Sequence, residues 1–374
     1  MTYILDPPNP TPAPATHALV IGVGKYMPNT WQLPDLGSPP LSAEAFARWM
    51  LTEYRNPLAP LASMEVLWSP PAAPAPFARP GASQVQVDAA TLTNVEQAIG
   101  RWFALCHQSV DNVAVFYFCG HGVKRGLDSW LLLEGFAGPA KLNLDDALKF
   151  TDFLLGMDKC LARKQIYFID SCRDTPAAAN NVQVNFGRTI VTPDRSATPG
   201  VLRDVAGLVS AADRSAFGAN NEVSRLTQAL LIALRGAGWD DRTHPWTEWL
   251  VSTDTLVTYV NALLQYEEQV RGAPFQRVQS LPDSANIIFH YPAPGTMPTV
   301  PLLIGLNAQP YPAPTAFAVS RGGAVVAQRP PMPADWEPAP QLEVAHDYVV
   351  SATSGGQTVQ KPVVLRPACR IERL

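Results

Sequence analysis

The sequence lacks most of the features that mark membrane, secreted and nucleic-acid-binding proteins. Its longest apolar runs are only as long as a β-strand, so no transmembrane helix is expected. The first residues, Met1–Pro8, have neither the basic start nor the apolar run of a signal peptide. The balance of 28 Lys and Arg against 32 Asp and Glu gives a net charge of -4, without a basic run suited to nucleic acid. We therefore expect a cytoplasmic protein with no nucleic-acid or membrane partner.

Cysteine is also scarce. The chain has 5 cysteines, an odd number without the spacing of a disulfide framework, which favours a reducing compartment. It contains no Cys-x-x-Cys or His-x-x-x-His pair, so no metal site is expected. The segment Gly22–Tyr26 has two glycines and a lysine but lacks the spacing of a phosphate-binding loop, and a tight turn explains it better.

Proline, in contrast, is abundant, and its distribution divides the chain. Residues 1–16 are rich in Pro, Thr and Ala and predict a flexible N-terminal arm. Residues 17–292 carry the strand and helix patterns of one large domain, and frequent prolines after it predict a small β-rich module over 293–374. Inside the large domain, residues 174–203 are rich in Asn, Pro, Thr and Ala and predict a long loop.

The large domain alternates apolar strands with helical segments. Apolar runs predict strands at 17–26, 64–68, 112–120, 164–171 and 207–212, and amphipathic patterns predict helices at 43–52, 92–106 and 145–161. Ser42 is expected to cap the first of these helices. Strands that alternate with helices of this length form a parallel sheet. The expected fold class is therefore α/β, with an open, mostly parallel sheet flanked by helices.

Two of the predicted strands end in chemically capable residues. One ends at His121-Gly122 and the other at Asp170-Ser-Cys172. The carboxyl ends of parallel strands emerge at one edge of a sheet, where open α/β sheets place their sites. A thiol reacts as a thiolate and needs a nearby base, so Cys172 and His121 are a candidate catalytic dyad. The N–H groups of Gly122 and Cys172 are the candidate oxyanion hole.

A purely structural role would explain either residue alone. Cysteine is often a small buried residue, and a loop histidine needs no catalytic function. Two such motifs at two strand ends, 51 positions apart, are harder to explain in that way. The remaining cysteines fit helix faces, a strand interior and the terminal module: Cys106, Cys119, Cys160 and Cys369.

With these motifs the sequence resembles the caspase-like cysteine peptidases, the clan of caspases, metacaspases and their bacterial relatives. The resemblance covers residues 17–290 and rests on Leu19–Tyr26, Phe118–Gly122 and Asp170–Arg173, in that order. It implies a caspase-like fold and hydrolysis of peptide bonds through an acyl-enzyme, with no organic cofactor. Cys172 is then the nucleophile and His121 the general base and acid.

The residue two positions before Cys172 predicts the substrate. Animal caspases have Gln-Ala-Cys here, whereas this chain has Asp170-Ser-Cys172, as metacaspase-like proteins do. A carboxylate on the same side of the strand as the thiol would pair with Arg or Lys and repel Asp. The prediction is cleavage after a basic residue. The alternative is that Asp170 only hydrogen-bonds the backbone or caps a loop.

Three more residues are substrate-binding candidates by the same resemblance. Metacaspase-like proteins often have a second Asp at the start of the first helix, where this chain has Ser42. Asp35, in the preceding loop, is a candidate to replace it. Ser210 lies in a segment, 205–215, that is similar to a later strand of these domains.

The resemblance also raises two modes of activation. Many caspase-like zymogens are cut in the segment after the nucleophile, and here that segment contains Arg188, Arg195 and Arg203 as autocleavage candidates. Metacaspase-like proteins are often activated by calcium, for which Asp145-Asp146 and Asp240-Asp241 are acidic pairs, although solvated helix ends explain them equally well.

The sequence therefore predicts a bacterial caspase-like endopeptidase that cuts after Arg or Lys. Its C-terminal module is expected to bind a substrate, activator or effector, and relatives serve in antiviral defence or programmed cell death. Two alternatives stay open. One is a catalytically silent scaffold or regulatory binding protein, and the other is a thiol hydrolase that turns over esters without cutting peptides.

Overall fold

The computed structural model describes most of the chain, in fourteen stretches. They are residues 3–9, 13–26, 28–72, 76–79, 84–138, 145–171, 187–191, 204–210, 221–241, 249–272, 276–281, 284–307, 313–338 and 341–374. The chain forms two compact units. One comprises Met1–Gln228 and Gln276–Tyr291, and the other comprises Ala229–Phe275 and Pro292–Leu374. The functional domains expected at 17–292 and 293–374 stay a prediction.

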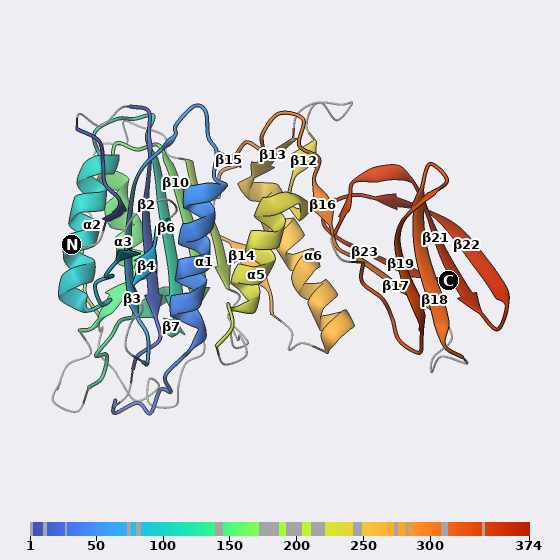
Figure 1. Cartoon of the computed structure of the whole chain (residues 1–374). Coiled ribbons are helices and arrows are strands. Elements are labelled where there is room, and N and C mark those ends of the chain that lie inside the picture. Colours follow the sequence, from blue (N-terminus) through green and yellow to red (C-terminus); the bar gives the residue numbers. More distant parts are fainter. Residues whose placement is uncertain are drawn as a thin grey trace. The chain divides into compact units, whose positions relative to one another are not determined.

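A seven-stranded sheet forms the centre of the first unit (Figure 1). Its strands in spatial order are β1 (Tyr3–Leu5), β3 (Leu61–Ser69), β2 (Thr16–Val23), β6 (Val113–Gly120), β10 (Lys164–Ser171), β11 (Asp204–Ser210) and β14 (Val278–Ser280). The inner strands are parallel, and β1 and β14 are antiparallel to their neighbours. This confirms the α/β fold class, with an open and mostly parallel sheet.

Helices cover both faces of this sheet, as Figure 1 shows. On one face lie α2 (Leu92–Cys106) and α3 (Phe150–Gly156), and on the other lies α1 (Ser38–Thr52). Side chains along β6 point alternately to the two faces of the sheet and pack against the helices on both. Phe116 and Phe118 join the core cluster that includes Trp102 of α2, whereas Tyr117 stacks on Phe46 of α1 with ring centroids 4.5 Å apart. Burial on both faces explains why the predicted strand is apolar throughout.

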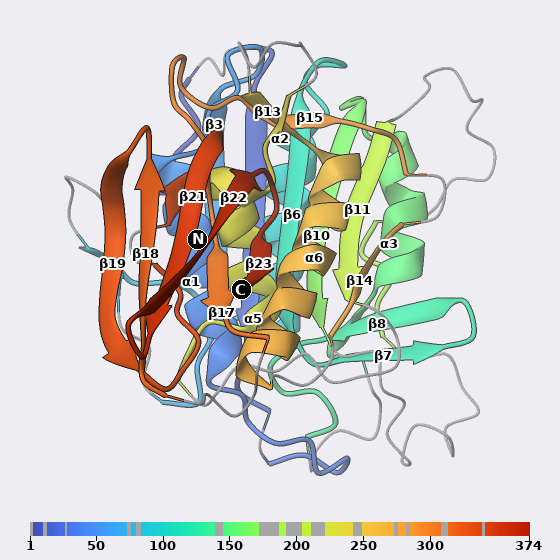
Figure 2. The same cartoon turned by 90° about the vertical axis from the view of Figure 1, so that its right-hand side faces the viewer.

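Shorter elements complete this unit. They are β4 (Phe77–Ala78), β5 (Gln84–Val85), β7 (Gly122–Arg125), β8 (Asp128–Leu132), β9 (Ala147–Lys149), a 3₁₀ turn η1 (Met157–Lys159) and β15 (Ile288–His290). β7, β8 and β9 form a small antiparallel sheet. The hairpin of β7 and β8 projects beyond the end of β6 in Figure 2.

Two predicted helices differ from those observed. The first begins at Ser38, because Pro39 and Pro40 fit the opening turn of a helix, where no N–H partner is needed. Ser42 therefore lies inside α1 and does not cap it; its hydroxyl donates to the Ser38 carbonyl at 2.8 Å. The single helix expected over 145–161 is wrong, because β9, α3 and η1 divide that stretch.

Residues 187–191 lie against β9. The Arg188 N–H donates to the Ala147 carbonyl at 2.7 Å, and the Lys149 N–H donates to the Arg188 carbonyl at 3.0 Å. The Thr189 hydroxyl donates to Asp152 of α3 at 2.8 Å. This part of the predicted loop 174–203 is therefore attached to β9 by an isolated parallel β-bridge between Leu148 and Arg188.

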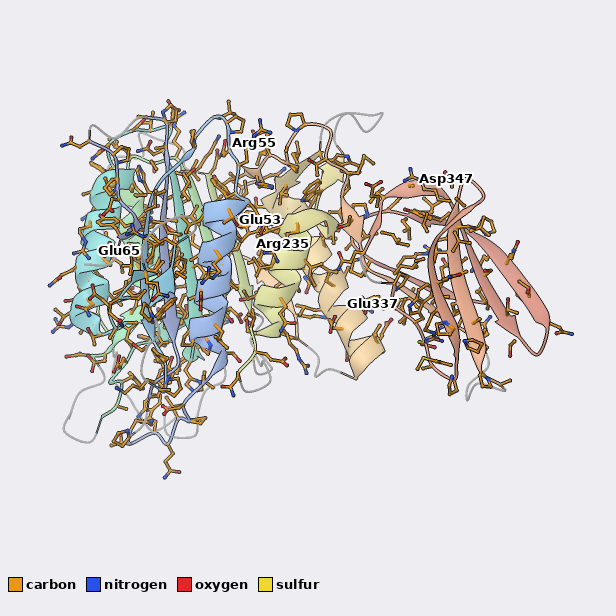
Figure 3. The ribbon with its side chains drawn as sticks, viewed as in Figure 1. Glu53, Arg55, Glu65, Arg235, Glu337 and Asp347 are labelled. Carbon is orange, nitrogen blue, oxygen red and sulfur yellow. The ribbon has the colours of Figure 1, made fainter. Side chains whose placement is uncertain are left out.

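One acidic side chain is buried between the large sheet and α2. Glu65 of β3, labelled in Figure 3, is 2% exposed and forms an ion pair with Arg101 of α2. The buried charge is thus compensated by a guanidinium, as buried charges generally are.

The second unit joins helices to β-sheets, and the division between the units falls inside α5 (Arg225–Ile232). It contains a π-helical turn η2 (Ala233–Ala237), β12 (Asp240–Asp241), β13 (Trp249–Ser252), α6 (Thr253–Arg271), β16 (Thr299–Val300), β17 (Leu302–Gly305), β18 (Thr315–Arg321), β19 (Ala324–Met332), β20 (Leu342–Glu343), β21 (Ala345–Ser354), β22 (Gln357–Leu365) and β23 (Arg370–Arg373). A four-stranded antiparallel sheet, in the order β19-β18-β21-β22, is the largest sheet among the described residues of this unit. The C-terminal part is β-rich, as its sequence predicts.

Candidate active site

The carboxyl ends of β6 and β10 lie side by side in register. The two strands pair in parallel along their whole length, and the pairing ends with Gly120 opposite Ser171. In the sequence His121 follows Gly120 directly, and Cys172 follows Ser171 directly. Each candidate catalytic residue thus directly follows the last paired residue of one of two neighbouring strands. Cys172 itself lies outside the described residues.

The imidazole of His121 is half-buried and held from two sides. Its Nε2 atom lies 3.0 Å from the carbonyl oxygen of Pro34. Since a carbonyl oxygen only accepts, this bond places the proton of the neutral ring on Nε2 and leaves Nδ1 as the basic nitrogen. The ring of Tyr26 meets the imidazole edge-on, with centroids 4.6 Å apart.

The surroundings of His121 favour its neutral form. Burial lowers the pKa of the ring from its usual 6.5, whereas the Pro34 carbonyl and the Asp35 carboxylate act in the opposite direction with smaller effects. A neutral imidazole is the form that can take a proton from a thiol. The electrostatics therefore suit a general base at neutral pH.

Tyr26 contacts the histidine directly, and Asp35 contacts Tyr26. The Tyr26 hydroxyl accepts a hydrogen bond from the His121 N–H at 2.9 Å and donates to the Leu132 carbonyl at 3.2 Å. Asp35 accepts from the Tyr26 N–H at 2.6 Å. The structure thus places Asp35 beside the histidine. The sequence pattern marked Tyr26 only as the end of a strand motif and missed its contact with His121.

Gly122 begins the hairpin that follows the histidine. It is buried and lies opposite Leu131 of β8. The carbonyl of His121 accepts from the Leu132 N–H at 3.0 Å, so the main chain on both sides of the histidine is fixed. The assignment of Gly122 and Cys172 as oxyanion donors stays a prediction.

Asp170 is buried near the end of β10, with 1% of its surface exposed. Its Oδ2 atom accepts hydrogen bonds from the hydroxyls of Ser224 and of Thr227, the latter at 2.8 Å. Its Oδ1 atom has no hydrogen-bond partner among the described residues. Burial raises the pKa of the carboxyl, and the two hydroxyls and the Cys119 thiol partly oppose the rise. The described part of the chain pairs no Lys or Arg with this carboxylate.

Ser42 belongs to the same buried cluster. Its hydroxyl accepts from the Ser224 N–H at 2.9 Å. The Ser224 hydroxyl in turn accepts from the Thr227 N–H at 3.3 Å and so caps α5. Sequence reasoning missed Ser224 and Thr227 as neighbours of Asp170. A serine just before a helical run is a cap signal that identifies the first of them, but not its contact with Asp170.

Of the other predicted residues, Ser210 lies beside Asp170 on the neighbouring strand, because the parallel register pairs Val209 of β11 with Ile169 of β10. Ser210 ends β11 opposite Val278, and its hydroxyl lies 3.5 Å from the Gln276 side chain. Arg188 is exposed, with its backbone paired to β9. Arg195 and Arg203 lie outside the described residues.

The acidic pairs proposed for calcium lie in two different places. Asp146 is buried next to β9, and Asp240 and Asp241 form β12, which pairs with β13. Among the residues that the structure describes, no group of three or more His, Cys, Asp or Glu side chains is arranged to hold a metal ion. Within the same residues, no helix is long and apolar enough to cross a membrane.

Comparison with known proteins identifies the family. The sequence model of the caspase domain matches residues 15–285, and this range contains both strand ends of the site. The chain therefore belongs to the caspase domain family of cysteine peptidases, which confirms the resemblance seen in its motifs.

Individual relatives are distant. An uncharacterized protein of Sinorhizobium fredii, y4kE, is 28% identical over 188 residues, which are 49% of this chain and 52% of that protein. The chain thus matches about half the length of this curated relative. Protein GSU0716 of Geobacter sulfurreducens shares 15% identity with a TM-score of 0.42, and covers 72% of this chain and 93% of its own. The Arg-specific cysteine proteinase gingipain R shares 12% identity with a TM-score of 0.33, over 95% of this chain and 67% of its own.

Proposed function

We propose that this chain is an active cysteine endopeptidase in which Cys172 and His121 form the catalytic dyad. The observation that carries the proposal is the register of β6 and β10, which ends one residue before each of them. In the proposed reaction, Nδ1 of His121 takes the thiol proton, and the thiolate attacks the scissile carbonyl carbon. The resulting imidazolium gives its proton to the leaving amine as the C–N bond breaks. Water, deprotonated by the same imidazole, then hydrolyses the thioester.

We further propose that the enzyme cuts after Arg or Lys and that Asp170 recognises the side chain of this substrate residue. Asp170 is fully buried, and its Oδ1 atom has no hydrogen-bond partner among the described residues. Burying a carboxylate in this way costs free energy unless a positively charged group pairs with it. An Arg or Lys side chain of a substrate supplies that charge, whereas an acidic side chain would be repelled. The proposal needs the substrate to reach Oδ1, because Ser224 and Thr227 already occupy Oδ2.

Matched fluorogenic peptides test both parts of this proposal. The peptides would differ only in the residue before the cut, which is Arg, Lys, Asp or citrulline, the uncharged analogue of Arg. We expect cleavage of the Arg and Lys peptides only, and none by Cys172→Ala. Equal turnover of the citrulline and Arg peptides would disprove the role of Asp170. An inactive wild type across the panel, with and without calcium, would favour a silent scaffold, and turnover of esters alone would favour a different thiol hydrolase.

Autocleavage in the segment 174–203 is part of the proposed activation. Arg188 is a poor candidate, because both its N–H and its carbonyl are hydrogen-bonded to β9, and a peptidase needs an extended, accessible backbone. We therefore expect cuts after Arg195 or Arg203. Intact-mass spectrometry of wild type and Cys172→Ala would locate them. A dominant cut after Arg188, or an uncut segment in active enzyme, contradicts this expectation.

The biological role is proposed from family membership alone. The enzyme would act on a protein substrate in the cytoplasm, such as an effector of bacterial antiviral defence or programmed cell death. Residues 293–374 would recognise an activator, a substrate or that effector. Comparing new protein termini in cells that express wild type or Cys172→Ala would identify the substrates.

A further inference from the structure

The phenol of Tyr26 is buried at the point where β6 turns into the β7–β8 hairpin. Only 2% of Tyr26 is exposed, and its hydroxyl makes two hydrogen bonds to main-chain groups. One partner is the His121 N–H and the other is the Leu132 carbonyl of β8. A single oxygen therefore ties the catalytic strand end to the hairpin.

The loop that carries Tyr26 also holds the side chain of His121. Pro34 accepts from Nε2 of the ring, and its neighbour Asp35 accepts from the Tyr26 N–H. The loop is closed at its base by the Leu36 N–H, which donates to the Gly24 carbonyl at 2.7 Å. Consecutive residues of one closed loop thus fix both the imidazole and the tyrosine that contacts it.

Close packing around the phenol leaves little freedom. A Cβ atom at Gly120 would lie 2.7 Å from the Tyr26 hydroxyl oxygen and 3.1 Å from the Val23 carbonyl. Only glycine at this position lets the hydroxyl approach the strand end. Gly120 therefore has a physical reason to precede the histidine.

We propose that Tyr26 is the positioning residue for His121, holding the main chain through its hydroxyl and the imidazole through its ring edge. The inference rests on the proposed function, since it concerns the base of the proposed dyad. Among the described residues, the titratable groups that face His121 are Asp35 and Tyr26 itself. Loss of the hydroxyl would leave the phenyl ring beside the imidazole but remove one of the two hydrogen bonds that fix the His121 main chain.

The test compares Tyr26→Phe with Tyr167→Phe. Tyr167 is a matched control because it is equally buried and its hydroxyl donates to a side chain, that of Gln165, at 2.8 Å. For Tyr26→Phe we expect kcat to fall about ten-fold or more while KM changes less than two-fold, because the acid–base group is misplaced but the substrate site is intact. Tyr167→Phe is expected to keep both constants within two-fold.

A second readout does not require peptide cleavage. The rate of alkylation of Cys172 by iodoacetamide, followed against pH, reports the apparent pKa of the thiol next to the imidazole. We expect this value to lie below that of an ordinary thiol in wild type, and to move up in Tyr26→Phe and in His121→Ala. A wild type that cleaves no peptide but shows this His121-dependent profile would refute the proposed function and leave the positioning role standing.

Two outcomes would overturn the inference. One is a Tyr26→Phe enzyme whose kcat and alkylation profile match wild type. The other is measured on the wild-type protein, so it tests the inference even if the Tyr26→Phe variant does not fold. The amide of His121 is expected to exchange its hydrogen slowly, because its acceptor is a buried phenol oxygen, and rapid exchange measured by NMR would contradict the bond.

Discussion

At the carboxyl end of β6, His121 is held by two groups that carry no full charge, the Pro34 carbonyl and the Tyr26 phenol. One residue before the end of β10, Asp170 is completely buried and held by two hydroxyls. The first arrangement suits a ring that works from its neutral form. The second buries a carboxyl group whose pKa is raised by burial. The two adjacent strand ends thus differ: neutral groups of the chain itself hold His121, whereas Oδ1 of Asp170 has no hydrogen-bond partner among the described residues.

The most direct way to break this comparison is to remove the imidazole. His121→Gln is expected to lower kcat by roughly 10²–10⁴-fold, the usual contribution of a positioned acid–base group. His107→Gln is the control, since His107 is exposed; its ring accepts from the Leu161 N–H at 3.1 Å and stacks on Phe103. Steady-state kinetics on an Arg peptide measure both variants. Similar losses in the two would mean that the effect of His121 is structural.

Neutralising Asp170 separates specificity from stability. Asp170→Asn keeps the shape and the hydroxyl contacts but removes a buried charge, so we expect Arg-peptide kcat/KM to fall about 100-fold while thermal stability is kept or raised. Glu65→Gln is the matched contrast, because it removes a buried charge that is already paired with Arg101. That variant should keep its activity and lose stability. The reverse pattern would show that Asp170 is a structural residue.

Removing one of the two hydroxyls should have a smaller effect. Thr227→Val deletes the group that lies 2.8 Å from Asp170 and 2.6 Å from the Tyr117 hydroxyl. We expect KM for Arg peptides to rise several-fold, with kcat changed less, and a loss of about 1–2 kcal/mol in the free energy of unfolding. Thr52→Val removes the hydroxyl at the end of α1 that donates to the Arg48 carbonyl and serves as the control. An unchanged KM in Thr227→Val would exclude a positioning role for this hydroxyl.

The pH dependence of stability tests the buried titratable groups independently of activity. Burial lowers the pKa of His17 to about 4, below its ordinary value in the unfolded chain, so the folded protein binds fewer protons between pH 6.5 and 4. Its contribution to stability is fully present above pH 6.5 and falls by up to about 3 kcal/mol as the pH decreases through that window. Asp170 acts with the opposite sign, because its raised pKa favours the folded state in acid.

Chemical denaturation at several pH values measures these slopes. His17→Gln should flatten the loss of stability in acid, whereas Asp170→Asn should make it steeper, since the compensating protonation is gone. Identical slopes in wild type and both variants would show that neither buried group is linked to folding.

Much of the site could be predicted because its main determinants are local. Strand residues that are apolar on both faces, followed by a polar tip, are visible in the sequence, and parallel strands bring such tips to one edge. The pattern alone therefore predicts His121 and Gly122 at a strand end, whereas Asp170 is predicted as a substrate-binding residue through the resemblance to metacaspase-like proteins; these roles stay predictions. The start of α1 was misplaced because Ser42 resembled a cap, although Pro39 and Pro40 allow an earlier first turn.

The partners of these residues could not be predicted in the same way. Tyr26 meets His121 across 95 positions of sequence, and Ser224 meets Asp170 across 54. Hydroxyls and carbonyls occur throughout the chain, so nothing in the sequence singles out the few that tertiary folding brings together. Residues 187–191 illustrate the same limit, since their loop-like composition does not reveal the pairing with β9.

The pairing of β6 with β10 joins residues that are 51 positions apart throughout. This separation is set by the segment that connects the two strands, which comprises the hairpin, α3 and loops. Loops tolerate insertions, so the length of this segment can vary. A longer or shorter crossover in another member of the family would change the count and leave the strand ends side by side. Searches for distant members should therefore look for two apolar strands with reactive tips, whatever the distance between them. A fixed interval would overlook enzymes with the same active-site architecture.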